Sequence, residues 1–118
     1  MLPRKHRLTE SRDFRRLQSR GKRRAGRYVA LRALAMGDCP SRFGVSVSER
    51  VGKAVVRNRV KRRLREAVRL VLPEAAHGWD FVLNARQGAA SASFEELADE
   101  VKGGIESFVR AGGTRNGA

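Results

Sequence analysis

The chain has 118 residues, 41% of them apolar, with 26 Lys and Arg against 12 Asp and Glu, for a net charge of +14. The length suits one domain that buries roughly two thirds of its unfolded surface without disulfides or metals, and the apolar content excludes a wholly disordered basic tail. Because charge of this size opposes compaction unless a polyanion neutralises it, nucleic acid is the first expected partner and a membrane surface the second.

Residues 1–8 are expected to form a short basic N-terminal arm. The following stretch, TESRDFRRLQSRG, predicts a helix that Thr9 or Ser11 caps and Gly21 ends. Phe14 and Leu17 share one face of this helix, which is too short to be stable unless it docks.

Two strands are predicted at about residues 28–35 and 42–48, joined by a turn at GDCPS and paired antiparallel. In the second strand, apolar residues alternate with small ones. The apolar set is Phe43, Val45 and Val47, and the small set is Gly44, Ser46 and Ser48. One strand face should therefore join the core, while the other either admits a ligand close to the sheet or simply faces solvent.

The stretch KAVVRNRVKRRLREAVRLVL predicts a long amphipathic helix that Pro73 ends. One arc of this helix is apolar, with Val56, Val60, Leu64, Ala67, Val68 and Val71. The residues outside it are Asn58, Arg59, Lys61, Arg62, Arg65 and Arg69, with Arg63 at its margin. Arg57 falls inside the apolar arc, so we expect it to need a phosphate or a carboxylate as partner. The basic face is expected to follow phosphates, with a merely solvated face as the alternative.

A third strand is predicted at GWDFVLNAR, followed by a helix over SFEELADEVKGGIESFVRAGG. Ser93 and Glu96 have the spacing of a capping box at the start of that helix. Most of the acidic residues gather in it, so it should face away from a polyanion. Residues 1–110 are expected to form a single domain, and residues 111–118 a disordered tail.

Residues for catalysis are not grouped in any recognisable motif. The sequence contains no HExxH, P-loop or dinucleotide-binding pattern, and nothing indicates that His6 and His77 meet. Cys39 is the single cysteine and no apolar run follows the basic N-terminus, so a cytoplasmic protein is expected. Without a DNA-reading motif, structured RNA is the favoured partner. Phe14 and Tyr28 are candidates for base stacking, with core packing as the alternative.

The ordered set GVSVSERVGKAVVRNRVKRRLRE, preceded by RLTESRDFRRL and followed by DFVLNAR, resembles the protein subunit of bacterial ribonuclease P. The resemblance covers about residues 4–110. It implies an α/β (α+β) two-layer sandwich with a central sheet of about four strands and three helices. It also implies a left-handed βαβ crossover through the motif helix, which patterning could not predict because right-handed crossovers are the rule.

This resemblance implies an RNA-binding subunit that assists a catalytic RNA in removing the 5′ leader from precursor tRNA. Catalysis and its Mg²⁺ ions would belong chiefly to the RNA, so no catalytic residue is assigned to the protein. The protein alone should be inactive, and it should form a one-to-one complex with the RNA as a monomer.

Two binding surfaces are implied by the same resemblance. The motif helix would contact the catalytic RNA through Arg57, Asn58, Arg59, Lys61, Arg62 and Arg65. A cleft between the sheet and the first helix would hold the leader, with Phe14, Val29, Leu31 and Ser46. Relatives often carry aromatic residues where this chain has Gln18 and Leu31, so phosphate contacts should matter more here than stacking.

Three other functions are compatible with parts of the sequence. A ribosomal or other translation-associated RNA-binding protein would have a similar composition, but the ordered motifs favour the ribonuclease P subunit. A protein-only nuclease would have to cleave precursor tRNA without RNA. A membrane-surface binder fits least, because the basic helix face lacks apolar anchors.

Overall fold

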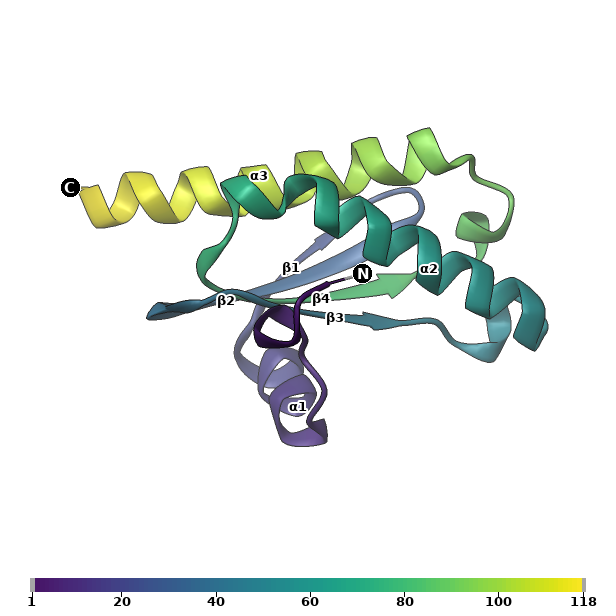
Figure 1. Cartoon of the computed structure of the whole chain (residues 1–118), viewed down its shortest axis with the longest axis horizontal. Coiled ribbons are helices and arrows are strands. Elements are labelled where there is room, and N and C mark those ends of the chain that lie inside the picture. Colours follow the sequence, from purple (N-terminus) through teal and green to yellow (C-terminus); the bar gives the residue numbers. More distant parts are fainter. Residues whose placement is uncertain (1, 118) are drawn as a thin grey trace.

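The computed structural model describes residues 2–117, apart from the side chains of residues 74 and 112–117. A four-stranded mixed sheet carries α2 and α3 on one face and α1 on the other (Figure 1). The strands are β1 (Lys22–Ala25), β2 (Val29–Pro40), β3 (Arg42–Ser46) and β4 (His77–Ala85), and the α-helices are α1 (Ser11–Arg20), α2 (Ala54–Val71) and α3 (Phe94–Gly117). The predicted class, four strands and three helices are confirmed, and α1 adds cover on the second face.

The strand order is β1-β2-β4-β3, with β4 antiparallel to β2 and parallel to β3. The predicted direct pairing of β2 with β3 is wrong because β4 lies between them. The segment Asp80 to Leu83 of β4 is buried on both faces, which suits an interior strand. The chain passes the start of β4, where the Ser41 N–H donates to the Ala76 carbonyl, and returns on its other side as β3.

Strand β1 was not predicted from the sequence. Its four residues, KRRA, are all exposed at the sheet edge, where they pair with β2. A charged edge strand lacks the apolar alternation that identifies a half-buried strand, and such charge protects an edge from pairing with other chains.

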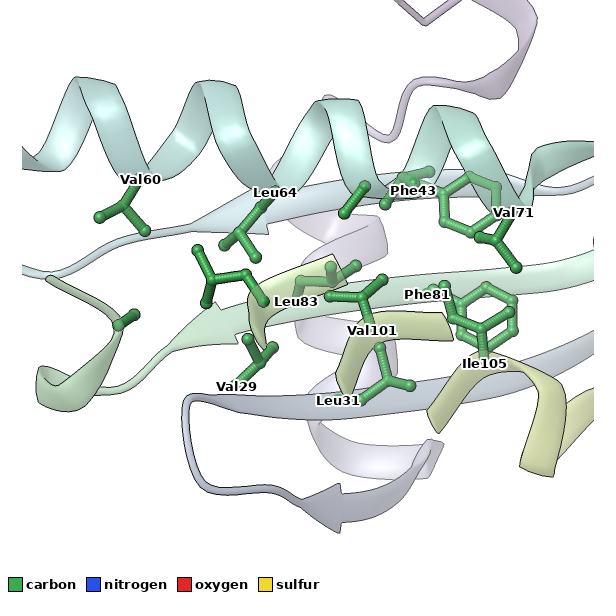
Figure 2. Close-up of a cluster of buried hydrophobic side chains, with 14 of the residues drawn as sticks. Val29, Leu31, Phe43, Val60, Leu64, Val71, Phe81, Leu83, Val101 and Ile105 are labelled. Atoms are coloured by element: carbon green, nitrogen blue, oxygen red, sulfur yellow. The ribbon is translucent and has the colours of Figure 1, made fainter. Parts of the chain in front are cut away.

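The main core lies between the sheet and the pair α2 and α3 (Figure 2). Helix α2 connects the parallel neighbours β3 and β4 and buries most of its predicted apolar arc, with Val56 only half-buried. The buried residues of this arc are Val60, Leu64, Ala67, Val68 and Val71. Because one helix face is fully used for packing, its basic residues are left on the remaining surface.

Helix α3 begins with the predicted capping box. The Ser93 N–H donates to Glu96 Oε1 at 2.9 Å and the Glu96 N–H donates to Ser93 Oγ at 3.1 Å. The hydrogen bond from the Ser93 backbone, followed by one from Tyr28, lowers the pKa of Glu96. The helix continues to Gly117, so most of the segment expected as a disordered tail is helical, and Ala118 lies outside the described residues. Helical hydrogen bonds are local and can continue past the packed region.

The N-terminal arm packs against β3 instead of extending freely. Leu2 joins the main core, and the Leu8 N–H donates to the Phe43 carbonyl at 2.9 Å. His6 is buried, and its Nδ1 donates to the Ser41 carbonyl at 2.6 Å. These contacts hold the arm along the outer side of β3.

Helix α1 crosses the other face of the sheet over a smaller core. The core residues are Leu8, Leu17 and Val82, with Phe14 and Leu34 packed against them. Gly21 ends the helix as predicted, but Glu10 occupies the N-cap position without a side-chain cap, in place of Thr9 or Ser11. Docking on the sheet therefore replaces capping as the source of helix stability.

Arg42 joins α1 to the sheet. Its Nε and Nη2 donate to the Asp80 carboxylate at 3.0 and 2.7 Å, and its Nη1 donates to Asp13 Oδ2 at 3.2 Å. Both carboxylates are buried, and the hydrogen bond to Asp80 raises the pKa of Arg42. Arg16 also donates to Asp13. These hydrogen bonds and ion pairs therefore link β3, β4 and α1.

Replacing Arg42 should destabilise the fold strongly. Arg42→Ala is expected to lower the free energy of unfolding by about 3–5 kcal/mol, because the buried Asp80 carboxylate loses its cation. Urea unfolding measures this difference. The control, Arg12→Ala, breaks an exposed pair with Glu10 and should cost about 1 kcal/mol or less. Equally small losses in the two variants would contradict a structural role for Arg42.

Candidate RNA interface

A groove with a volume of about 690 Å³ lies between the N-terminal arm, β3 and α2. Phe14 of α1 and Gly44 of β3 line it together with residues of the arm. On the opposite side it is lined by α2, through Asn58, Lys61, Arg62, Arg65 and Glu66. The groove therefore brings the first helix and the basic helix, which are far apart in sequence, to one site.

Four polar residues of α2 form a stripe along the groove. Asn58, Lys61, Arg62 and Arg65 have the spacing i, i+3, i+4 and i+7, which puts them on one helix face over roughly 10 Å. None of their side chains makes a hydrogen bond or ion pair with any other residue that the structure describes. These side chains are therefore available for an anionic ligand, and their spacing in the sequence was already a sufficient signal for the stripe.

Three other arginines of α2 bind backbone carbonyls. Arg57 Nη1 donates to the Gly52 carbonyl at 3.2 Å, so this residue has a neutral partner in place of the phosphate or carboxylate expected for it. Arg59 Nη2 donates to Ala90 at 3.3 Å and Arg63 Nη1 to Ala92 at 3.1 Å. Arg59 Nε is buried with no partner among the described residues. These side chains attach α2 to its flanking loops, a role that the charge pattern alone did not reveal.

Phe14 is held against β3 by the absence of a side chain at Gly44. A Cβ built on Gly44 would lie only 2.6 Å from the Phe14 ring. Ser46, two residues further along the same strand face, is exposed. The small face predicted for this strand is confirmed, and part of it serves to seat Phe14.

Val29 and Leu31 do not lie with Phe14 and Ser46. Both are 4% exposed in the main core, on the sheet face covered by α2 and α3 (Figure 2). Their assignment to the leader cleft is wrong because side chains alternate between faces along a strand. The β2 residues that face α1 are one position away, at Ala30 and Arg32, whose partners on β4 include Val82 of the smaller core.

A row of small residues crosses the sheet beside α1. Ser46 on β3 is opposite Asn84 on β4, which is opposite Ala30 on β2, which is opposite Ala25 on β1. Directly paired residues share a sheet face, so this row lies on the same face as Ser46, with Ser46 and Ala25 exposed at its ends, Asn84 half-buried and Ala30 buried. Asn84, Ala30 and Ala25 were not predicted as site residues, because only the strand order places them together.

Tyr28 lies apart from the groove. Its hydroxyl donates to Glu96 at 2.8 Å, and this hydrogen bond raises the pKa of Tyr28. The ring packs against the main core, and the Arg27 guanidinium lies 5.4 Å from its centre. Core packing, the alternative to base stacking for Tyr28, is therefore the better interpretation.

The acidic residues near the groove are already paired. Arg69 donates to Glu66 and lowers the pKa of its carboxyl group, while Arg42 and Arg16 bind Asp13. The electrostatic potential in the groove is consequently set mainly by the unpaired positive charges of the α2 stripe. Within the described part of the chain, no three His, Cys, Asp or Glu side chains are placed to hold a metal ion. The described helices also include none with the length and apolar character of a membrane span.

Comparisons with known proteins identify the family. A family model described as Ribonuclease P matches residues 2–109. The ribonuclease P protein component of Picosynechococcus sp. is 41% identical over 102 residues, covering 86% of this chain and 88% of that protein. The protein of the same name from Bacillus cereus is 37% identical over 112 residues, covering 94% and 95%.

Solved structures agree with the sequence matches. The RNase P protein from Thermotoga maritima aligns with a TM-score of 0.77 at 27% identity, covering 86% of this chain and 96% of that one. A Staphylococcus aureus RNase P protein structure aligns with a TM-score of 0.72 at 28% identity, covering 80% and 86%. This chain is therefore a small basic α/β protein with the same fold as these two structures. It belongs to the ribonuclease P protein family.

The seat of Phe14 can be tested with two glycines. Gly44→Ala is expected to lower the free energy of unfolding by about 1–3 kcal/mol, because the new methyl group displaces the Phe14 ring. Gly103 lies exposed in α3, where an added Cβ would meet nothing within 4 Å, so Gly103→Ala should raise stability by up to about 1 kcal/mol. Urea unfolding measures the free energy of unfolding of both variants. An unchanged free energy of unfolding in Gly44→Ala would contradict the tight contact between Gly44 and Phe14.

Proposed function

We propose that this chain is the RNA-binding protein subunit of ribonuclease P and assists a catalytic RNA in removing the 5′ leader of precursor tRNA. The observation that carries this proposal is the groove that joins Phe14 to the unpaired basic stripe of α2. RNA recognition commonly combines phosphate contacts with the stacking of unpaired bases on aromatic rings. The groove offers both kinds of contact within one surface.

The stripe on α2 is proposed to bind phosphates of the catalytic RNA. Lys61, Arg62 and Arg65 supply three unpaired cations at helical spacing, and Asn58 adds a neutral donor and acceptor. Arg57 and Arg59 hold the loops beside the stripe through carbonyl hydrogen bonds. Each still has further guanidinium N–H groups that can reach a phosphate, because arginine carries five donors.

The leader is proposed to lie beside α1. Phe14 would stack on one base, and the small row from Ser46 to Ala25 would let the backbone of the leader approach the sheet. Gln18 is exposed one helical turn after Phe14 and offers hydrogen bonds where relatives often carry a ring. Fewer stacking surfaces make phosphate contacts along this path more important.

Hydrolysis is proposed to occur in the RNA subunit, which would also hold most of the Mg²⁺. Magnesium in proteins prefers carboxylate oxygens together with water and substrate phosphates. Among the residues that the structure describes, the groove is lined by one carboxylate, Glu66, which Arg69 already binds, so these side chains do not fit a protein magnesium site. The chemistry assigned to this chain is binding and orientation, in a one-to-one cytoplasmic complex with the RNA.

Cleavage of one precursor tRNA by the cognate catalytic RNA tests the proposal. At low, near-physiological Mg²⁺, addition of the protein should restore cleavage, while the protein alone should be inactive. Unchanged activity of the RNA would reject the subunit assignment and favour a translation-associated RNA-binding protein. Cleavage by the protein alone would instead indicate a protein nuclease.

Salt dependence tests the stripe. Arg62→Ala and Arg59→Ala are both expected to weaken association with the catalytic RNA, and each should reduce the slope of log K against log salt by about 0.9 for one lost duplex phosphate contact. Only Arg59→Ala should also lower Tm, because it removes the hydrogen bond to Ala90. Lys102→Ala, exposed on α3, is the control. Unchanged affinity and slope for both arginine variants would reject the assignment.

A further inference from the structure

Two arginines stand directly opposite each other on neighbouring strands. The register of β1 and β2 pairs Arg23 with Arg32, and the next pair along the ladder is Arg24 with Leu31. Directly opposite residues project from the same sheet face. Leu31 lies in the core under α3, so Arg24 belongs to that face, and Arg23 and Arg32 belong to the face crossed by α1.

This like-charge pair is unfavourable for the isolated protein, because identical charges at directly opposite positions destabilise a sheet. Arg32 Nη1 donates to the Gln18 carbonyl at 3.3 Å, which is a neutral partner. The Arg23 side chain makes no hydrogen bond or ion pair with the residues that the structure describes, and it is exposed on the edge strand. Asp13, the acidic residue of α1, is occupied by Arg42 and Arg16.

Helix α1 leads from the groove to this pair. Phe14 contacts Gly44 on β3, Leu17 packs with Val82 on β4, and the Gln18 carbonyl binds Arg32 on β2. The helix thus crosses the strands in sequence, and its last residues approach β1. Three strand spacings separate β3 from β1, or about 14 Å. The small row from Ser46 to Ala25 runs beside this helix along the same path.

We propose that Arg23 and Arg32 bind the phosphates of the leader upstream of the nucleotides that contact Phe14. This inference rests on the proposed function and extends it, because it assigns a second contact region and a direction to the leader. An RNA phosphate placed between the two guanidinium groups would convert their repulsion into a bridge. Arginine suits this position because its forked donors match phosphate oxygens.

The leader is the favoured occupant for a positional reason. Arg23 and Arg32 lie at the β1 edge of the sheet, whereas the α2 stripe proposed for the catalytic RNA borders β3 at the other edge. A single strand that follows α1 from Phe14 reaches Arg32 and then Arg23. The pair therefore contributes only to leaders long enough to cross the sheet.

The test compares leader lengths in the reconstituted holoenzyme. Binding of precursor tRNAs with leaders of about four and about twelve nucleotides, which bracket common single-strand site sizes, is measured for the wild type, Arg23→Ala and Arg24→Ala. Arg23→Ala is expected to weaken binding of the long leader about three- to fivefold and to reduce its salt slope by about 0.7. Short-leader binding should not change. Arg24→Ala removes the same charge from the opposite face of the same strand. It should leave the length effect, which is the ratio of the affinities for the long and the short leader, as it is in the wild type.

A charge reversal separates binding from folding. Arg23→Glu places opposite charges across the ladder, so its Tm should equal or exceed that of the wild type, while long-leader binding falls further than in Arg23→Ala. A lowered Tm in Arg23→Glu would overturn the inferred repulsion between Arg23 and Arg32.

Three binding results would overturn the leader assignment. In the first, Arg23→Ala binds the long leader more tightly than the short leader by the same factor as the wild type. In the second, Arg23→Ala loses the same affinity for both leaders. In the third, Arg23→Ala binds the catalytic RNA more weakly in the absence of precursor tRNA. If the wild-type protein fails to restore cleavage at low Mg²⁺, the proposed function fails as well. If it restores cleavage and Arg23→Ala keeps the full length effect, only the present inference fails.

Discussion

The ion pairs of Arg42 determine how the two faces of this protein are related. In a chain with a net charge of +14, two of the few carboxylates, Asp13 and Asp80, are buried around one guanidinium. A buried carboxylate is tolerated only when a cation and hydrogen bonds compensate its lost hydration. The network therefore fixes α1 across the sheet. That position places Phe14 over Gly44 at one edge and directs the end of the helix toward Arg32 at the other.

The arginines of helix α2 fall into two structural groups. Arg57, Arg59 and Arg63 donate to backbone carbonyls of the flanking loops, whereas the stripe from Asn58 to Arg65 borders the groove. A charged segment that is uniform in sequence thus occupies two different environments in the folded protein. Charge on the stripe and on Arg23 is not compensated within the described structure, which is the arrangement expected of a surface whose stability is completed by a polyanion.

Local patterns in the sequence correctly predicted the features that do not depend on contacts with distant parts of the chain. The apolar arc of α2, the capping box of Ser93 and Glu96 and the alternation around Gly44 depend on residues within a few positions of one another. The pairing of the strands could not be predicted from such local patterns. The β2 and β3 segments were expected to pair, but the more deeply buried β4 lies between them, and the exposed β1 gave no apolar signal. Val29 and Leu31 were placed on the wrong face because a shift of one residue reverses every side chain.

By itself, the sequence determined the class of fold, the helix that carries the basic stripe, and the family, because periodicity, charge and ordered motifs are local properties of the chain. Only the tertiary structure decided that the arm packs on β3, that Phe14 and the α2 stripe share one groove, and that Arg23 meets Arg32. These relations depend on strand order and on where the buried carboxylates find their cation. Both are set by contacts between residues distant in sequence, which no local pattern specifies.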